Sequence, residues 1–452
     1  MPDYTPHTDD EVEQMLGFLG LSSLDDLFST VPDALRLAAG LDLDDGLPEP
    51  DVMARMDDLA HLNTPTGRKL VCFAGGGAYD HEVPPVVRAL ASRSEFVTSY
   101  TPYQPEVAQG VLQALFEFQT LIARLSGMQV ANASLYDGAA AVVEAVNLGV
   151  ASSGRSTVWV SSGLNPSWRA VLRTFAAGTG HHIVEVPISG GATDWGDPGA
   201  EASGGDAPGA LVVAYPNYLG CLEDLSRARA VCDRTGALLV VAFDPVCAGI
   251  VRSPRDWGAD VVVGEGQALG TPLSFGGPYL GLFACTLEHV RRLPGRLVGE
   301  TADADGRRAY VTTLRAREQD IRREKATSNV CTNQTLMAVT AAIQLGWLGS
   351  SGLEEVALRS ARAAAYCRHG LLSLSGIEPL FDAPVLREFA LRLPIDAATV
   401  VDRMVDSGFL AGIPLDPAYA GGKDDSLLVA LTERRTRVEI DAFVTAMDKA
   451  VR

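Results

Sequence analysis

Short apolar runs alternate with helical patterns through the middle of the chain, from about residue 69 to residue 286. Most of these runs are continuous rather than alternating, which is typical of strands that are covered on both faces. Segments with helical spacing separate them, so the region predicts βαβ units and a mostly parallel sheet. The clearest predicted strands are residues 157–161, 182–187, 210–214, 237–243 and 259–263.

Helical periodicity is strongest over residues 105–126, where apolar side chains recur every three or four positions and therefore share one face. Pro105 suits the first turn of this helix, and Gly127 suits a left-handed stop. Two further helices are predicted between the strands, at residues 166–176 and 222–235.

The two ends of the chain follow other patterns. Thr8 and Glu11 have the spacing of a capping box, ahead of short amphipathic helices. Towards the C-terminus, two helical stretches, residues 334–348 and 354–374, precede strand candidates at residues 388–393 and 426–432. A glycine-rich segment, residues 190–209, predicts an exposed loop. We expect three parts: an N-terminal helical segment (1–65), a large α/β domain (66–325) and a smaller C-terminal α+β domain (326–452).

Charge and composition exclude several classes of function. The 452 residues carry a net charge of −19, which disfavours binding to nucleic acid. No apolar run approaches the ~20 residues of a membrane span. The first ten residues lack the pattern of a signal peptide, and the seven cysteines form no CxxC pair. We therefore expect a cytoplasmic protein with reduced thiols.

Lysine is scarce, and its positions matter for chemistry. The 37 basic residues include only four lysines, at positions 69, 325, 423 and 449. Asp244 ends one predicted strand, and a glycine-rich loop, residues 264–278, follows the next. Ligands bind at this edge of open α/β sheets. Pyridoxal-phosphate enzymes place there an Asp for the pyridine nitrogen and a lysine for the Schiff base, but this loop contains no lysine. Helix–strand packing explains the Asp equally well.

Two polar segments are candidates for binding. Residues 99–109 place tyrosines, glutamines and a glutamate at the entrance of the strongest helix. Both a binding site and an ordinary polar loop would have this composition. Residues 315–333 combine arginines, Lys325, acids and amides. A solvated face with ion pairs explains that composition, and so does a carboxylate or phosphate site made by paired arginines. His81 stands alone in a glycine-rich turn, where a satisfied loop residue is the simpler interpretation.

Several longer motifs resemble one family, the glycine cleavage system P-protein (glycine decarboxylase). The start of the chain, YTPHTDDEVEQML, is similar to subunit 1 of its two-subunit bacterial form. The motifs are AYDH (78–81), SYTPYQPE (99–106), ANASLYDG (131–138), GEGQALGTPLSFGGPYLG (264–281), PGRLVGETADADG (294–306) and REQDIRREKATSNVCTNQ (317–334).

The resemblance implies an α/β fold, that of fold-type I pyridoxal-phosphate-dependent transferases, in an α2β2 assembly. Subunit 2 would carry the Schiff-base lysine and the cofactor, pyridoxal phosphate. Subunit 1 would lack that lysine, whose place in this chain falls near Gln267. It would keep Asp244 as a vestigial partner of the pyridine nitrogen and help to wall the shared site. The complex would decarboxylate glycine and pass the aminomethyl group to the lipoyl arm of the H-protein.

The residues that this resemblance places on the wall of the shared site come from three segments. They are Tyr100, Thr101, Tyr103, Gln104 and Glu106, then Asn132, Ser134 and Asp137, and then Arg323, Lys325, Thr327 and Asn329. No catalytic residue is expected on this chain alone, and no metal. Two alternatives stay open: a specialised paralogue or non-catalytic scaffold that acts with a pyridoxal-phosphate partner on another small amino acid, and a different enzyme that uses Lys325 for its Schiff base.

Overall fold

The computed structural model describes residues 6–37, 41–67, 69–99, 101–196, 207–326 and 328–452. The chain separates into two compact units, Met1–Thr64 and Pro65–Arg452. This division lies next to the boundary expected at residue 65. The further boundary expected near residue 326 stays a prediction.

The first unit contains two helices, α1 (Asp9–Leu19) and α2 (Glu49–His61), and two short 3-10 helices, Leu24–Phe28 and Asp33–Leu35. The predicted capping box is present at the start of α1, where Thr8 and Glu11 each bond the backbone N–H of the other. No described residue of this unit is buried. Its elements are therefore held by local caps rather than by a core.

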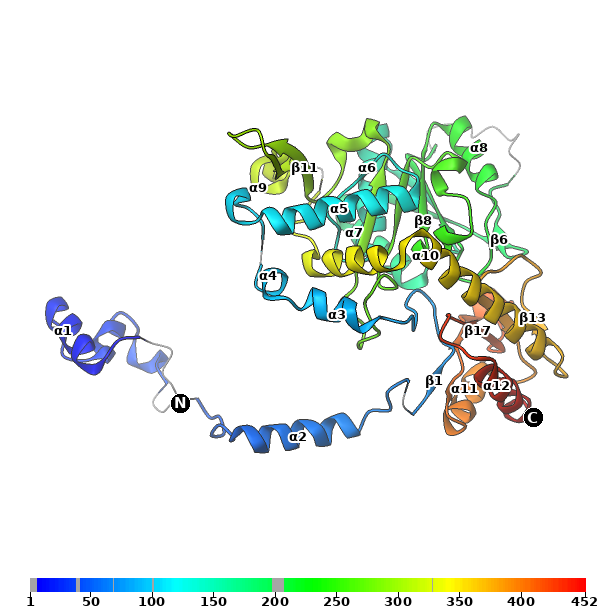
Figure 1. The fold of residues 1–452 in the computed structure, drawn as a ribbon, viewed down its shortest axis with the longest axis horizontal. Coiled ribbons are helices and arrows are strands. Elements are labelled where there is room, and N and C mark those ends of the chain that lie inside the picture. Colours follow the sequence, from blue (N-terminus) through cyan, green and yellow to red (C-terminus); the bar gives the residue numbers. More distant parts are fainter. Residues whose placement is uncertain (1–5, 38–40, 68, 100, 197–206, 327) are drawn as a thin grey trace. The chain divides into compact units, whose positions relative to one another are not determined.

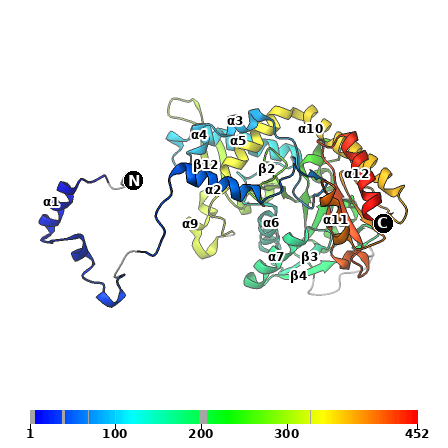
Figure 2. The same cartoon turned by 90° about the horizontal axis from the view of Figure 1, so that it is seen from below.

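The second unit is built on a seven-stranded sheet (Figures 1 and 2). Five of its strands are parallel, and β10 runs antiparallel to both of its neighbours. The strands are, in spatial order, β2 (Val130–Ala131), β10 (Gly281–Cys285), β9 (Val261–Glu265), β8 (Leu238–Phe243), β7 (Ala210–Tyr215), β3 (Thr157–Ser161) and β4 (His182–Val186). All five predicted strands are present, which confirms the mostly parallel α/β sheet.

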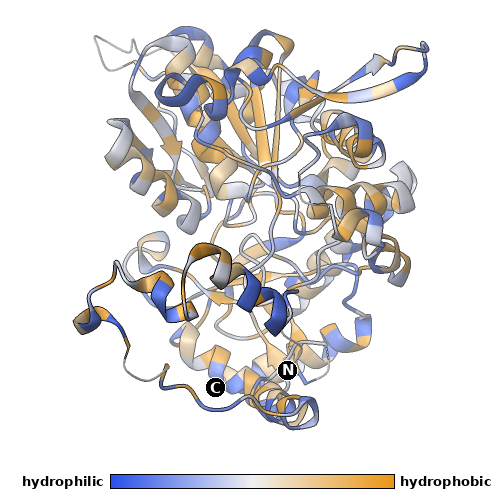
Figure 3. Ribbon diagram, turned by 90° about the vertical axis from the view of Figure 1, so that its left-hand side faces the viewer, coloured by the Kyte–Doolittle hydropathy of each residue, from blue (hydrophilic) through white to orange (hydrophobic). Residues whose placement is uncertain are grey.

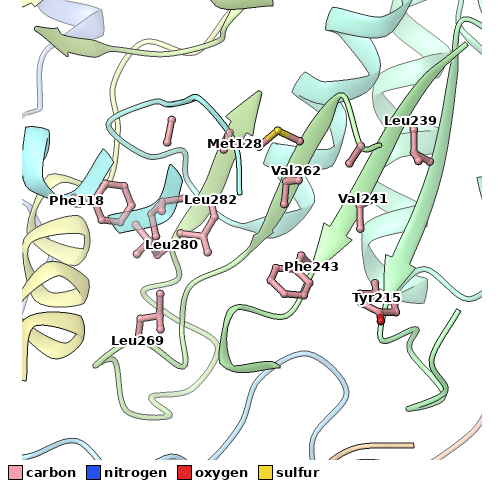
Figure 4. Close-up of a cluster of buried hydrophobic side chains, with 14 of the residues drawn as sticks. Phe118, Met128, Tyr215, Leu239, Val241, Phe243, Val262, Leu269, Leu280 and Leu282 are labelled. Carbon is pink, nitrogen blue, oxygen red and sulfur yellow. The ribbon is translucent and has the colours of Figure 1, made fainter. Parts of the chain in front are cut away.

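Helices cover both faces of this sheet. The main ones are α5 (Gln109–Ser126), α6 (Gly138–Ser153), α7 (Pro166–Thr179), α8 (Leu225–Thr235) and α10 (Thr335–Leu372). Alternate residues of a strand point to opposite faces, so Leu211 and Val213 of β7 join the core under α5, α8 and α10, whereas Val212 joins the core under α6 and α7. Figure 4 shows part of the first core, and in Figure 3 the central strands are coloured as hydrophobic throughout.

Helix α10 crosses from the sheet to the C-terminal layer. It packs against α5 near its start and against α12 (Arg437–Ala450) near its end. Gly349, at φ 60° and ψ −174°, interrupts it, so the two separately predicted helices are joined at a kink. Among the described residues, α10 is the one helix whose length and composition would suit a membrane span. Its packing within the fold accounts for that composition.

The C-terminal layer is an antiparallel sheet with helices packed against it. Its strands are β13 (Glu378–Pro379), β14 (Glu388–Arg392), β17 (Ser426–Ala430) and β16 (Ile413–Pro414), and α11 (Ala397–Asp406) lies beside α12. An early segment joins this layer: β1 (Val71–Cys72) pairs with β15 (Phe409–Leu410), and the ring of Phe73 stacks on that of Phe443 with centroids 3.9 Å apart.

The remaining elements are short: α3 (Pro85–Ala91), α4 (Ser94–Val97), α9 (Gln319–Arg322), and the hairpins β5 (Ile188–Ser189) with β6 (Ala192–Thr193) and β11 (Leu297–Ala302) with β12 (Arg308–Thr313). The second of these hairpins packs against α5.

Two expectations need correction. Helix α5 begins at Gln109 rather than Pro105, because Pro105–Val107 forms a separate 3-10 turn and Ala108, at φ −124°, leaves the helical region. The segment 190–209 is not exposed throughout: Thr193 and Trp195 are buried. The hydroxyl of Thr193 donates to the buried Glu223, which anchors this segment.

Candidate functional site

A pocket lies at the carboxyl ends of the parallel strands, where the sequence predicts a ligand site. Asp244 and Pro245 follow β8, Glu265 ends β9, and Gln267 comes two residues later. Trp168 of α7 and Arg387, just before β14, complete its walls together with Tyr79, Asn165 and Tyr218. The pocket contains about 580 Å³ of empty space, part of it open to solvent.

Asp244 is paired within this pocket. Its Oδ2 lies 2.5 Å from Nη2 of Arg387, and both side chains are largely buried. The Arg387 guanidinium also lies over the ring of Tyr79, 3.6 Å from the ring centroid. Burial, the largest single effect, lowers the pKa of this guanidinium, but the Asp244 carboxylate and the other acidic groups around it together outweigh burial and raise the pKa above its ordinary value. The pair is therefore an internal salt bridge.

A buried histidine extends this salt bridge. Nη1 of Arg387 donates to Nε2 of His81, and Nδ1 of His81 lies 2.6 Å from a carboxylate oxygen of Glu433. Because a guanidinium has no acceptor atom, Nε2 must accept and Nδ1 must carry the proton that is donated to Glu433. Both ring nitrogens of His81 are thus hydrogen-bonded within the fold, which agrees with its interpretation as a satisfied loop residue.

Gln267 closes the floor of the pocket. Its Oε1 accepts a hydrogen bond from the backbone N–H of Tyr79 (2.9 Å), and its Nε2 donates to the carbonyls of Tyr79 (3.1 Å) and Thr271 (2.7 Å). The side chain is only 1% exposed, and its amide has used both donor hydrogens. Gln267 therefore ties the glycine-rich loop to the segment around Tyr79. No lysine lies among the described residues that line the pocket.

Glu265 accepts three backbone hydrogen bonds beside the pocket, each 2.9 Å long. They come from Gly138, the first residue of α6, and from Gln267 and Leu280. Helix N-termini bind anions through such N–H groups, so this carboxylate occupies the anion site of α6. Burial raises the pKa of Glu265 to about 7, against the effect of these hydrogen bonds.

The side chains of this pocket do not fit covalently bound pyridoxal phosphate. That cofactor requires a lysine amine, a carboxylate free to face the pyridine nitrogen and an anion site for the phosphate. Here no lysine is among the described lining residues, Arg387 neutralises Asp244, and Glu265 accepts from the backbone N–H at the start of α6. Tyr79 offers no reactive anion at neutral pH, because burial raises the pKa of its hydroxyl well above the ordinary value.

A second group of predicted residues meets around a buried arginine, Arg296. Its Nη2 donates to the hydroxyl of Tyr103 (3.0 Å), and its Nη1 contacts Oδ1 of Asn333 (3.3 Å). Arg296 and Arg315 both lie over the Tyr103 ring, 4.9 and 5.6 Å from its centroid. Tyr103 is half exposed, so the two guanidinium groups fix an aromatic ring at the surface.

The same network reaches Ser134 and Asn132. Asn333 and the backbone N–H of Gln334 donate to the hydroxyl of Ser134. Asn132 accepts from the backbone of Ser134 and donates to the carbonyl of Pro294. Ser134 has φ 98°, a strained conformation for a residue with a side chain. The structure therefore connects Tyr103, Asn132 and Ser134 through Arg296 and Asn333.

The other predicted residues are placed more simply. Asp137 caps α6 by accepting from the N–H of Ala140. Gln104 and Glu106 are exposed, and Thr101 is partly buried. Arg323, Lys325 and Asn329 are also exposed, and none of them lines the Asp244 pocket. Tyr100 and Thr327 lie outside the described residues.

Sequence reasoning missed Arg387, Glu265, Arg296 and Asn333 as site residues. Arg387 and Asp244 are 143 positions apart in the chain, so only the fold brings them together. Arg296 and Glu265 stand inside motifs that carry the family resemblance, and this was the one signal that could have singled them out.

Comparison with known proteins agrees over nearly the whole chain. The family model described as "Glycine cleavage system P-protein" matches residues 2–447. The chain is 46% identical to a probable glycine dehydrogenase (decarboxylating) subunit 1 of Moorella thermoacetica, covering 98% of both chains. It is 45% identical to the protein with the same description from Geotalea uraniireducens, over 99% of this chain and 100% of the other.

Solved structures lead to the same family. A crystal structure of glycine decarboxylase (P-protein) of the glycine cleavage system, in inhibitor-bound form, matches with a TM-score of 0.91 and 44% identity, covering 99% of this chain and 100% of that one. The glutamate decarboxylase of Lactobacillus brevis has a TM-score of 0.65 at 14% identity, covering 94% of this chain and 97% of that one, so it shares the fold alone. The fold is that of fold-type I pyridoxal-phosphate enzymes, as predicted.

Proposed function

This chain belongs to the glycine cleavage system P-protein family, and we propose that it acts there as subunit 1 of glycine dehydrogenase (decarboxylating). The relatives that match over the full chain are described as subunit 1, which implies a second subunit. We propose that the complex decarboxylates glycine and passes the aminomethyl group to the lipoyl arm of the H-protein, in an α2β2 assembly in the cytoplasm.

We further propose that pyridoxal phosphate is bound by the partner subunit, through a lysine of that subunit. The observation that supports this proposal is the pocket of this chain, in which side chains of the chain itself, Gln267, Arg387 and Glu265, bond the groups that a cofactor would need. The cofactor supplies an electron sink for the carbanion left by loss of CO2. A chain with this pocket would contribute to the reaction by shaping the site of its partner.

The network around Arg296 suits that role. Tyr103 is half exposed and rigidly placed, because its hydroxyl is bonded and two guanidinium groups lie over its ring. Rigid placement is what a residue that positions a substrate requires. We propose that Tyr103 and its neighbours, residues 100–106, face the shared site. Asn132, Ser134 and Asp137 would support that wall from behind, and the exposed residues Arg323, Lys325 and Asn329 would border the entrance.

Reconstitution tests this function directly. The purified chain alone should show no visible cofactor absorbance and no exchange of CO2 into glycine. Mixing it with a lysine-bearing subunit 2 and lipoylated H-protein should restore the glycine reaction. Covalent cofactor and CO2 exchange in the isolated chain would contradict the assignment, and so would a partner subunit that is fully active without this chain.

A further inference from the structure

The pocket at the carboxyl ends of the parallel strands has room for a ligand beside the salt bridge between Asp244 and Arg387. Its empty space of about 580 Å³, including the part open to solvent, lies within the ~300–1,000 Å³ that is typical of small-molecule sites. Aromatic and small apolar residues form much of its wall, namely Trp168, Tyr218, Ala214 and Ala242. Such a wall favours a flat ligand, because aromatic rings stack on one another.

Trp168 lies against the start of α6, where an anionic ligand would have to bind. A Cβ added at Gly138 would lie 2.3 Å from Cζ2 of Trp168, so only a glycine lets the ring approach the helix so closely. The backbone N–H of Gly138 already donates to Glu265, 2.9 Å away. An indole ring and a carboxylate thus take the place that a phosphate would use, and this end of the pocket disfavours a negatively charged group.

The charged side chains of the wall do not require a counter-ion from a ligand. Arg387 is the one basic side chain among the described lining residues, and it pairs with Asp244. Glu265 accepts three backbone hydrogen bonds, and burial raises its pKa to about 7. A ligand without net charge therefore matches the electrostatics of the pocket.

Two lining residues can donate hydrogen bonds to the polar edge of such a ligand. Nε of Arg387 has no hydrogen-bond partner among the described residues, although the side chain is only 5% exposed. The hydroxyl of Tyr218 keeps its proton, because burial raises its pKa to about 12. Buried donors nearly always have an acceptor in a native protein, so an acceptor atom on the ligand would complete the site.

We infer that this pocket binds an uncharged planar heteroaromatic molecule, which stacks on Trp168 and carries a hydrogen-bond acceptor on its edge. No lysine is among the described lining residues, so the ligand is held without a covalent bond. The site goes beyond the proposed function and does not depend on it, because every residue that forms it belongs to this chain.

Titration calorimetry of the purified full-length chain tests the inference with two matched pairs of probes. The first pair is pyridoxine and pyridoxine phosphate, and the second is adenosine and adenosine monophosphate. We expect at least one of the two uncharged probes to bind with a Kd below ~1 mM. Its phosphorylated form should bind at least ~10-fold more weakly, because Glu265 and Trp168 exclude the phosphate.

Variants locate the ligand. Trp168→Leu should weaken binding of the uncharged probe at least ~10-fold through loss of stacking. Trp347→Leu is the matched control: it removes a tryptophan of α10 that is 60% exposed, and binding should stay within about twofold of the wild type. Tyr218→Phe keeps the aromatic ring and removes only the hydroxyl, so it should weaken binding about fivefold. Circular dichroism would check that each variant keeps the native content of helix and strand.

Four results would overturn the inference. If neither uncharged probe binds, the pocket is not a site for such rings. If a phosphorylated probe binds as tightly as its uncharged counterpart, the pocket does not exclude anions. If tetramethylammonium binds more tightly than either ring, the pocket is a site for organic cations. If Trp168→Leu and Tyr218→Phe both leave binding unchanged, the ligand binds elsewhere on the chain.

Discussion

Replacing Arg387 with Met tests whether the salt bridge between Arg387 and Asp244 stabilises the pocket in place of a bound ligand. The substitution removes a cation that lies 2.5 Å from the Asp244 carboxylate, with side chains only 5% and 15% exposed. Asp244 would keep the N–H of Val246 and the thiol of Cys247 as donors, neither of which balances its charge. Removing one partner of a buried ion pair costs ~3–5 kcal/mol of unfolding free energy.

An exposed pair provides the matched control. Arg359 and Glu355 form an ion pair on α10 with side chains 63% and 50% exposed. Arg359→Met should therefore cost less than ~1 kcal/mol. Tryptophan fluorescence during urea unfolding would measure both variants, since Trp168 lines the pocket.

The double variant Asp244→Asn with Arg387→Met tests whether the two buried charges stabilise each other. It removes both buried charges, so it should regain much of the stability that Arg387→Met loses, and the coupling energy of the cycle should exceed ~1 kcal/mol. If Arg387→Met costs no more than Arg359→Met, or if the double variant is as unstable as the sum of its single changes, the pair does not stabilise the pocket.

Three further predictions concern the pocket and the network around Arg296; one involves Glu388, which accepts hydrogen bonds from the hydroxyl of Tyr79 and the N–H of Gly76. Gln267→Lys should not create a Schiff base with added pyridoxal phosphate, because Arg387 and Glu265 still block the other groups; a borohydride-stable adduct at residue 267 in mass spectrometry would contradict this. Burial raises the pKa of Glu388 to about 7, so the folded chain binds more protons than the unfolded chain between about pH 4.5 and pH 7, and the unfolding free energy falls as pH rises through that window. Glu388→Gln should remove ~3 kcal/mol of this pH dependence in urea titrations; an unchanged slope would exclude Glu388 as its source. Tyr103→Phe should lower the reconstituted rate at least ~10-fold through loss of the charge-assisted bond to Arg296, whereas Tyr366→Phe, at an exposed tyrosine on α10, should leave the rate unchanged.

The sequence predicted the sheet well because its strands are continuous apolar runs whose ends are set by their own residues. The start of α5 was misplaced because Pro105 suits a 3-10 turn as well as an α-helix, and local sequence does not decide between them. The anchoring of segment 190–209 was missed because it depends on Glu223, a residue of another segment.

The sequence predicted where the pocket lies, but not which side chains pair with its polar groups. Asp244 and the absence of a lysine near residue 267 could be seen in the sequence, since both depend on residue type at a strand end. The partners of Asp244 and of the α6 N-terminus could not, because Arg387 and Glu265 reach them only through tertiary packing. Of the predicted wall residues, Tyr103, Asn132 and Ser134 join one network around Arg296, whereas Arg323, Lys325 and Asn329 are exposed.

Three side chains of the pocket come from different parts of the chain, and each satisfies a different group. Gln267 bonds the backbone of Tyr79, Arg387 neutralises Asp244, and Glu265 accepts from the start of α6. Replacing one of them leaves the other two in place and exposes a buried group without a partner, which costs stability and provides no cofactor site. No single change in this pocket therefore creates a site for the cofactor, whereas the half-exposed ring of Tyr103 stays on the surface that this chain can offer to a partner.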